Sequence, residues 1–597
     1  MADTPPSSSG HRFRSQDWFA DPARSDMVAL YLERFMNYGI TPAELRSGRP
    51  IIGIAQTGSD LSPCNRIHID LARRVRDGIR DAGGIAMEFP VHPIFENCRR
   101  PTAALDRNLA YLGLVELLHG YPIDAVVLTT GCDKTTPSGI MAACTVDIPA
   151  IVLSGGPMLD GWHEGELVGS GTVIWRSRRK LAAGEIDEEE FLRRACDSAP
   201  SAGHCNTMGT ASTMNAVAET LGLSLPGCAA IPAPYRERGQ MAYETGRRIV
   251  DMAHEDLRPS RILTRESFLN AIRAVSAIGG SSNAQPHIVA MARHAGVEIT
   301  AADWTDHGYA LPLLLDMQPA GRFLGERFHR AGGVPSILWE LLEAGVLDGG
   351  CLTVTGRTLA ENLAGRETRD REMIRPFAEP LKERAGFMVL SGNLFDFAIM
   401  KTSVISPEFR DRYLSRPGAE GVFEARAILF EGGDDYHHRI NDPALAIDEN
   451  CILVMRGTGP LGWPGSAEVV NMQPPDALIQ RGVQWLPTLG DGRQSGTSDS
   501  PSILNCSPES AAGGGLSWLK TGDMIRIDMH AGRCDALVDE AEIARRKAEM
   551  PAPPVPPSHT PWEEIFREKT GQMADGAVLE MAVKYRGIAQ RTPRHNH

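Results

Sequence analysis

Short apolar segments alternate with amphipathic segments along the first two thirds of the chain. Ile51–Ala55 is an apolar run of strand length, and an apolar residue then recurs at every fourth position from Ile67 to Ile79. This spacing puts the apolar side chains on one face of a helix. Two further runs, Ala125–Leu128 and Pro149–Leu153, each end in a loop rich in Gly, Ser or Thr. The alternation predicts a mostly parallel sheet with helices on both faces.

The pattern changes after about residue 385. Phe387–Leu390, Ala425–Phe430 and Cys451–Met455 are short apolar runs with few long helical patterns between them. Ile525–Met529 alternates apolar and polar residues, and a turn after it can lead back into Cys534–Val538. These signals are typical of a β-rich region that contains a hairpin.

The patterns divide the chain into three parts. We predict a large N-terminal α/β domain over residues 1–385, in which residues 1–16 form a loose arm. A smaller C-terminal β-rich domain follows over residues 386–548. Residues 549–597 are predicted to form a Pro-rich linker and a helical tail, with the helix over 562–585.

Composition and charge exclude several classes of protein. The 597 residues are 42% hydrophobic and 23% charged, which excludes a disordered chain and a small disulfide scaffold. The 61 basic and 75 acidic residues give a net charge of −14, which disfavours nucleic-acid binding. The N-terminus is polar, and no apolar run reaches the roughly 18 residues of a membrane span. We therefore expect a cytoplasmic protein without membrane or nucleic-acid partners.

Three of the eleven cysteines lie in loops that are rich in small polar residues. These are Cys64, Cys132 and Cys205, and the first two closely follow predicted strands. Ligands of open α/β sheets bind beyond the carboxyl ends of the strands. Three thiolates there could hold an iron–sulfur cluster or zinc, although any lone cysteine can equally be a small buried apolar residue. We assign the other eight, Cys98, Cys144, Cys196, Cys228, Cys351, Cys451, Cys506 and Cys534, to the buried class.

Several charged residues near these loops admit two interpretations. Asp133 and Lys134 directly follow Cys132, and the Asp could ligate a hard cation or cap the helix that begins near Pro137. Glu96 and Glu468 lie in turn-rich segments of the two domains, where carboxylates usually face solvent. On the local sequence alone, capping and solvent exposure are the favoured interpretations.

A loop dense in Gly, Ser and Thr surrounds Ser495. Its serine could be a nucleophile, a base or an anion binder, or the loop could be an ordinary tight turn, which the segment by itself favours. Arg493 stands where a Gly-x-Ser-x-Gly elbow would need glycine. The Gly/Ser loop at 279–284 matches neither nucleotide-binding glycine motif.

Four motifs together resemble the dihydroxyacid and sugar-acid dehydratase family, which also contains 6-phosphogluconate dehydratase. The motifs are Thr130–Pro137, Gly203–Ala211, Gly279–Ala284 and Asp491–Thr497, and the resemblance runs in order from about residue 45 to about residue 548. It implies an α/β N-terminal domain that holds a cluster and a β-barrel-like C-terminal domain that closes over it. Within the family, the similarity is greatest to members that act on D-xylonate, through Tyr31–Gly39, Phe95–Pro101, Asn393–Ala398 and Pro593–His597.

The resemblance also implies cofactors and residue roles. Cys64, Cys132 and Cys205 would bind a [2Fe–2S] cluster. Mg²⁺ would bind at Glu96, Asp133, Lys134 and Glu468, with Lys134 carbamylated. That modification is chemically sensible because an ammonium has no lone pair for a cation, whereas a carbamate offers anionic oxygen. Ser495 would be the catalytic base, with Thr497 beside it in the substrate pocket.

The implied reaction is removal of water from a 2,3-dihydroxy sugar acid, most simply D-xylonate, in a homodimer or homotetramer. Two departures bear on the substrate. Ser282 replaces a threonine of the family pattern, and Asn505–Cys506 stands where branched-chain and phosphogluconate members carry a histidine before the Ser-Pro-Glu at 507–509. The alternatives are a family member acting on L-arabinonate, D-gluconate or a dihydroxyacid, a zinc hydrolase, and an iron–sulfur sensor.

Overall fold

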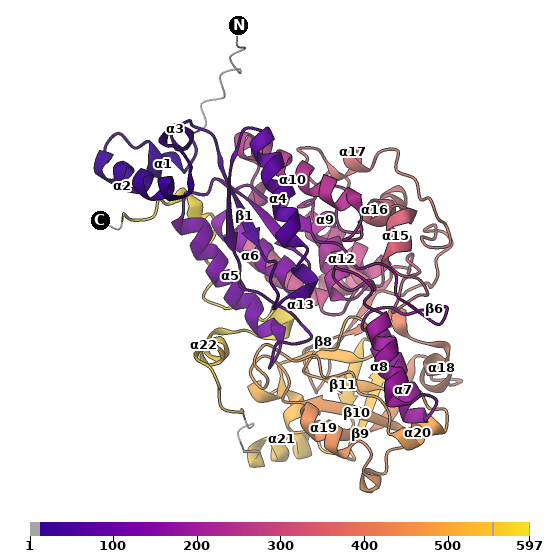
Figure 1. Cartoon of the computed structure of the whole chain (residues 1–597). Helices are drawn as coiled ribbons and strands as arrows, with labels where there is room; N and C mark the ends of the chain where they lie inside the picture. The colour runs from indigo at the N-terminus through magenta and orange to yellow at the C-terminus, as the bar shows by residue number, and fades with distance from the viewer. Residues whose placement is uncertain (1–11, 552–554, 596–597) are drawn as a thin grey trace.

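The N-terminal half is built on a four-stranded parallel sheet. The computed structural model describes residues 12–551 and 555–595 (Figure 1). The strand order is β2-β1-β3-β4, with β1 at Ile51–Gln56, β2 at Ile85–Pro90, β3 at Ala125–Thr130 and β4 at Ala150–Ser154. Every residue of β1, β3 and β4 is buried, as expected for apolar strands covered on both faces. The predicted parallel sheet is confirmed.

Helices cover both faces of this sheet. The crossover through α4 (His68–Asp81) leads from β1 to β2, whereas α6 (Thr135–Val146) leads from β3 to β4 in the opposite direction. Because such crossovers are right-handed, the two helices lie on opposite faces. Helix α10 (Arg236–Glu255) packs on α4, and α5 (Ala103–Gly120) packs on α6. The reversal places the topological switch point between β1 and β3, which is where α/β sheets bind ligands.

The C-terminal half is an eight-stranded, nearly closed sheet. Its order is β14-β13-β9-β10-β11-β12-β8-β7, and β9 to β12 run parallel to one another. Ser391, just after β7, bridges Arg533 of β14 and so brings the two edges together. The bounds are β7 Phe387–Leu390, β8 Phe397–Lys401, β9 Val422–Glu431, β10 Cys451–Arg456, β11 Thr488–Gly490, β12 Ile503–Ser507, β13 Met524–Asp528 and β14 Arg533–Ala536. The barrel-like prediction and the predicted hairpin, β13–β14, are confirmed.

A helical pair joins the two halves. Helices α7 (Thr172–Ala183) and α8 (Glu188–Asp197) belong to the N-terminal half but lie beside the barrel and α20 (Asp476–Gln480) (Figure 1). Gln480 donates a 3.1 Å hydrogen bond from Nε2 to the carbonyl of Ala182, at the end of α7. The remaining longer helices are α2 Ser25–Phe35, α9 Thr210–Thr220, α12 Arg265–Ala277, α13 Ala284–Ala295, α16 Gly333–Glu343, α21 Glu540–Glu549 and α22 Pro561–Lys569.

Both chain ends differ from the sequence prediction. Residues 1–11 lie outside the described residues, but 12–16 are not a loose arm. Phe13 is buried, and Arg14 donates to the carbonyls of Leu118 and Ile123. At the other end, residues 552–554 and 596–597 lie outside the described residues. The predicted helix over 562–585 ends at Lys569, because the next segment turns back to pair with residue 579. The boundaries at 385 and 548 stay a prediction.

The contact between α4 and α10 depends on glycine. A Cβ at Gly246 would overlap the carbonyl oxygen of Val75 in α4, whereas a Cβ at Gly239, in the same helix, would meet no atom within 4 Å. Overpacking of this kind costs about 1–3 kcal/mol. We therefore expect Gly246→Ala to lower the thermal midpoint by about 1–2 °C, because the shift per kcal/mol falls with chain length.

The matched control is Gly239→Ala, which adds the same methyl group to the same helix where there is room. Alanine is the better helix former by roughly 0.5–1 kcal/mol, so this variant should melt no lower than wild type. Equal midpoints for the two variants, measured by differential scanning calorimetry, would contradict the proposed close contact.

Candidate active site

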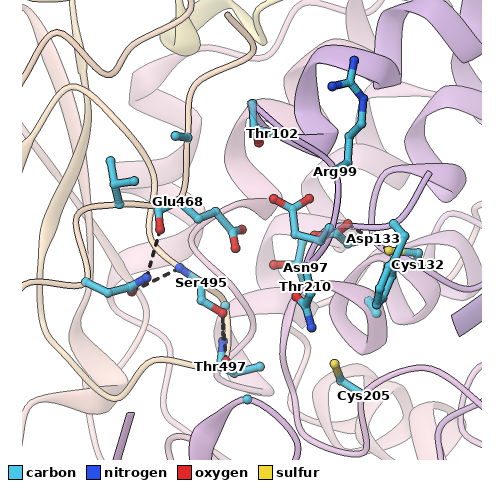
Figure 2. Close-up of a pocket in the computed structure, with 18 of the residues that line it drawn as sticks. Asn97, Arg99, Thr102, Cys132, Asp133, Cys205, Thr210, Glu468, Ser495 and Thr497 are labelled. Atoms are coloured by element: carbon cyan, nitrogen blue, oxygen red, sulfur yellow. Dashed lines mark hydrogen bonds between the residues drawn. The ribbon is translucent and has the colours of Figure 1, made fainter. Parts of the chain in front are cut away.

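A cavity of about 510 Å³ lies between the two sheets. Its N-terminal side is made by loops that follow the carboxyl ends of β1, β2 and β3, and its C-terminal side by loops that follow β10 and β11. Figure 2 shows Cys132, Asp133 and Cys205 on one side, with Glu468, Ser495 and Thr497 opposite. The structure brings every predicted site residue to this cavity: Cys64, Glu96, Cys132, Asp133, Cys205, Glu468, Ser495 and Thr497 line it, and Lys134 is buried against its carboxylates.

The three thiols share one end of the cavity. Cys64 and Cys132 lie on either side of the switch point, and Asn65 Oδ1 accepts a 2.6 Å hydrogen bond from the Cys132 amide. A hydrogen bond with Cys64, together with burial, holds the pKa of Cys132 well above its usual value. Burial raises the pKa of Cys205 to about 12. These shifts favour the protonated thiols of Cys132 and Cys205, and a metal centre would have to displace those two protons.

Lys134 lies at the centre of a carboxylate cluster. Its side chain is fully buried, with Nζ 2.5 Å from Glu96 Oε2, 2.7 Å from Asp133 Oδ2 and 4.0 Å from Glu468 Oε1. Burial and the charge of Arg493 lower the pKa of Lys134, but the three carboxylates outweigh them and raise it overall. The cluster thus already surrounds one cationic group.

Arg493 provides a second cation from the C-terminal half. Its Nη1 lies 2.9 Å from Glu468 Oε1 and its Nη2 lies 3.2 Å from Glu96 Oε1, with the side chain only 1% exposed. The Nε group donates to the Ser466 carbonyl at 2.8 Å. This guanidinium therefore links a carboxylate from each half of the molecule.

The pKa values of the three acidic side chains are shifted in different directions. Burial alone would raise the pKa of Glu96, but Lys134 and Arg493 lower it below its usual value. For Asp133, burial outweighs Lys134 and raises the pKa. Burial, reinforced by the charge of Glu96, raises the pKa of Glu468 to about 7. Three acids in one buried site cannot all ionise without further positive charge.

The oxygen-rich donor set suits a hard cation, with one qualification. Within the described residues, no three His, Cys, Asp or Glu side chains converge in the geometry of a bound metal ion. The Lys134 ammonium lies between the carboxylates, and it can donate hydrogen bonds but cannot ligate. Carbamylation would turn this group into an oxygen ligand. The carboxylates thus fit Mg²⁺, and the lysine fits it only when modified.

Ser495 and Thr497 form a hydroxyl pair in the loop after β11. Their side-chain oxygens are 2.8 Å apart, and the Thr497 amide approaches Ser495 Oγ at 3.4 Å. Asn471 Oδ1 accepts a 3.2 Å hydrogen bond from the Ser495 amide. A Cβ at Gly496 would overlap the hydroxyl groups of Ser281 and Thr210, so glycine lets the loop approach the motif at 279–284.

The favoured local interpretations of several residues are wrong. Asp133 does not cap α6, because Lys134 is the residue before that helix and the Asp133 carboxylate binds the lysine instead. Glu96 and Glu468 are not surface residues, since their side chains are 14% and 16% exposed. All eleven cysteines are free, and of the eight assigned to the buried class, Cys98 and Cys196 are exposed.

Sequence reasoning missed four residues that organise the site. Arg493 does not fit an elbow motif, and its position within the family motif Asp491–Thr497 does not by itself indicate a role. Asn283 donates to Glu468 Oε1 at 2.6 Å and lies in the Gly/Ser loop for which no role was predicted. Asn471 accepts a hydrogen bond from the Ser495 amide and Trp175 donates one to Thr497 Oγ1, and both lie in segments without any recognisable sequence signal.

The chain matches two family models in tandem. Residues 49–362 match the dihydroxy-acid/6-phosphogluconate dehydratase N-terminal model, and residues 372–577 match the C-terminal model.

Across the described residues, no helix is both long and apolar enough to cross a membrane.

Curated relatives align along almost the whole chain. It is 77% identical to a D-xylonate dehydratase of Caulobacter vibrioides over 98% of each chain. It is 43% identical to an L-arabinonate dehydratase of Rhizobium leguminosarum bv. trifolii over 90% of this chain and 91% of the relative. It is 37% identical to a dihydroxy-acid dehydratase of Caldanaerobacter subterraneus subsp. tengcongensis, over 89% and 94%.

Two sheets face one cavity, and both family models match in order, so the chain belongs to the dihydroxy-acid/6-phosphogluconate dehydratase family. It is a hydro-lyase. The resemblance expected from the motifs is confirmed.

The raised pKa of Glu468 predicts a pH-dependent stability. Glutamate in an unfolded chain titrates near pH 4.3, and Glu468 in the folded chain does so near 7. Stability from the bound proton is therefore present below about pH 4.3 and is lost as the pH rises through 7. In metal-free protein, Glu468→Gln should melt increasingly higher relative to wild type between pH 5 and 8.

The control for this experiment is Glu343→Gln, which changes an exposed glutamate. Its melting temperature relative to wild type should stay constant over the same range. A Glu468→Gln difference that does not change with pH would show that Glu468 is already ionised at pH 5.

Proposed function

We propose that this protein converts D-xylonate to 2-dehydro-3-deoxy-D-pentonate and water. The observation that carries the proposal is the placement of Ser495 and Thr497 in one cavity with three thiols and three carboxylates. The 77% identity to a D-xylonate dehydratase supports the particular substrate. The reaction removes a proton from C2 and the hydroxyl group from C3, and the resulting enol becomes a 2-keto acid.

The residues present suit two inorganic groups. Cys64, Cys132 and Cys205 would hold a [2Fe–2S] cluster, whose size does not require the three sulfurs to converge on a single point. Glu96, Asp133, Glu468 and a carbamylated Lys134 would hold Mg²⁺. When bound, these groups would supply Lewis acidity at the C3 hydroxyl and at the substrate carboxylate.

The chain's own residues handle the C2 proton. Ser495 Oγ faces the cavity and is the proposed base, which takes this proton as an alkoxide. Thr497 supports the alkoxide through its hydroxyl and amide groups, at 2.8 and 3.4 Å. Hydrogen bonds to the charged form of a group lower its pKa. The proton then leaves Ser495 with the departing hydroxide as water, so protons balance and no net oxidation occurs.

Positive charge would keep the carboxylate side of the cavity compatible with an anionic substrate. Three carboxylates alone would repel a sugar acid, whereas Arg493, joined by the Lys134 ammonium before carbamylation and by Mg²⁺ after it, would offset most of that charge. The finer proposals, namely the cluster type, the carbamylation, a homodimer or homotetramer and a cytoplasmic location, stay predictions.

A panel of acids tests the proposed substrate. Anaerobically purified protein should show its highest kcat/KM with D-xylonate and lower values with L-arabinonate and D-gluconate, because these substrates differ in hydroxyl orientation or length. It should not act on 6-phosphogluconate. Dihydroxyisovalerate as the best substrate would overturn the proposal, and hydrolysis without dehydration in a colourless zinc protein would favour the zinc hydrolase.

Ser495→Ala tests the proposed base. It removes the oxygen that would accept the C2 proton and touches neither the thiols nor the carboxylates. Loss of a general base costs about 10²–10⁴-fold in kcat. We expect that fall with unchanged visible absorption and similar KM, and retention of more than about a tenth of kcat would assign the base elsewhere.

Cys132→Ser tests the thiol centre. We expect the brown colour and the activity to be lost together, since the buried Cys132 would be one of three cluster ligands. Cys351→Ser is the matched control, because Cys351 is also buried but lies away from the cavity lining. Full iron content and activity in Cys132→Ser protein would refute the assignment.

A further inference from the structure

Trp175 contacts the hydroxyl pair from the N-terminal half. It lies near the start of α7, and its Nε1 donates a 2.9 Å hydrogen bond to Thr497 Oγ1. Thr172, at the first position of α7, donates from Oγ1 to the Thr497 carbonyl at 2.9 Å. A Cβ at Gly171 would overlap the Thr497 side chain, so glycine there permits this close approach. The start of α7 therefore packs directly against Thr497.

The hydrogen-bonding capacity of each group determines the direction of the two hydrogen bonds that join Trp175, Thr497 and Ser495. An indole N–H only donates, whereas a hydroxyl group has one proton to donate and two lone pairs. Thr497 is buried, and among the described residues its only acceptor partner is Ser495 Oγ. Ser495 is half-buried and faces the cavity, so its own proton can point toward a bound molecule. The arrangement that leaves no buried donor unpaired runs from Trp175 to Thr497 to Ser495.

We propose that Trp175 is a positioning residue that orients the Thr497 hydroxyl so that it donates to Ser495 Oγ. This inference rests on the proposed function, in which Ser495 is the base. With the Thr497 amide at 3.4 Å, the serine oxygen then receives two donors, an arrangement that suits an alkoxide. Hydrogen bonds in series also polarise one another, so the indole strengthens the donation by Thr497.

Helix α7 is fixed to the same loop by charge. Arg179 pairs with Asp499 at 3.1 Å and lies over the Trp485 ring. These contacts hold Trp175 in register with Thr497 without involving the indole. The other ionisable groups facing the cavity are Glu96, Asp133, Glu468, Arg99, Arg100 and the three cysteines. All of them are unchanged in the variants below.

The test is the pH dependence of kcat in the cluster-loaded enzyme. Trp175→Phe keeps a ring of similar shape and removes the N–H. A hydrogen bond changes an equilibrium constant by up to about tenfold. We therefore expect the rising limb of the plot of kcat against pH to shift to higher pH by about one unit. The KM and the visible spectrum should be unchanged, and kcat should recover at high pH. An unmoved limb would overturn the proposal.

A double-mutant cycle distinguishes an effect of Trp175 that is transmitted through the Thr497 hydroxyl, which we call the relay, from an effect of lost packing. In Thr497→Val protein no hydroxyl remains to be oriented, so adding Trp175→Phe should move the limb no further. Thr497→Ser keeps the hydroxyl and should keep the wild-type limb. Additive shifts from Trp175→Phe and Thr497→Val would contradict the relay.

Trp463→Phe is the matched control for the indole. Trp463 lines the same cavity, but its Nε1 donates to the Pro101 carbonyl at 3.2 Å, so its loss should leave the limb in place. Ser495→Ala separates the two proposals. If that variant keeps its activity, the proposed base fails, whereas an inactive Ser495→Ala with an unmoved Trp175→Phe limb refutes only the role of Trp175.

Discussion

The structure depends on a buried charge cluster that neither half of the chain completes alone. Lys134, Glu96 and Asp133 come from the N-terminal half, and Glu468 and Arg493 come from the C-terminal half. Removing a charge from water is costly unless an opposite charge replaces the lost solvation. Glu96 binds a cation from each half, so separating the halves would leave it with one partner. The same balance limits the net negative charge of the carboxylate-rich cavity.

The cluster can form because, in both sheets, the carboxyl ends of parallel strands face the cavity. In the N-terminal sheet, the reversal between β1 and β3 opens a crevice at the carboxyl ends of the strands. In the barrel, the parallel strands β10 and β11 likewise direct the loops of Glu468 and Ser495 to one end. The cavity is where these two edges meet, and helix α7 ties them together through Thr497 and Asp499.

Much of this could be predicted from the sequence, for identifiable reasons. Fully buried strands such as Ala125–Leu128 are continuous apolar runs, and the helix over 68–81 carries a strict apolar spacing. The thiols and Ser495 were found because short motifs of an established family surround them. Those motifs predicted the chemistry, but local patterns alone favoured a helix cap for Asp133 and a surface position for Glu96.

The remaining features depend on contacts between distant parts of the chain. Trp175 lies more than three hundred positions from its partner Thr497, so only the docking of α7 on the barrel reveals it. Arg14 likewise orders residues 12–16 by binding carbonyls around residue 120, which a polar composition cannot predict. The chain after Lys569 leaves its helix because pairing with residue 579 replaces helical hydrogen bonds.

The central claim is that this cavity removes the C2 proton and the C3 hydroxyl group of a sugar acid. The most direct test is nuclear magnetic resonance of D-xylonate turnover in deuterium oxide by anaerobically purified protein. Because the enol intermediate takes its new C3 proton from solvent, the account predicts a 2-keto-3-deoxy product with deuterium at C3. A product that retains only the substrate's own hydrogens at C3, or no product at all, would contradict it.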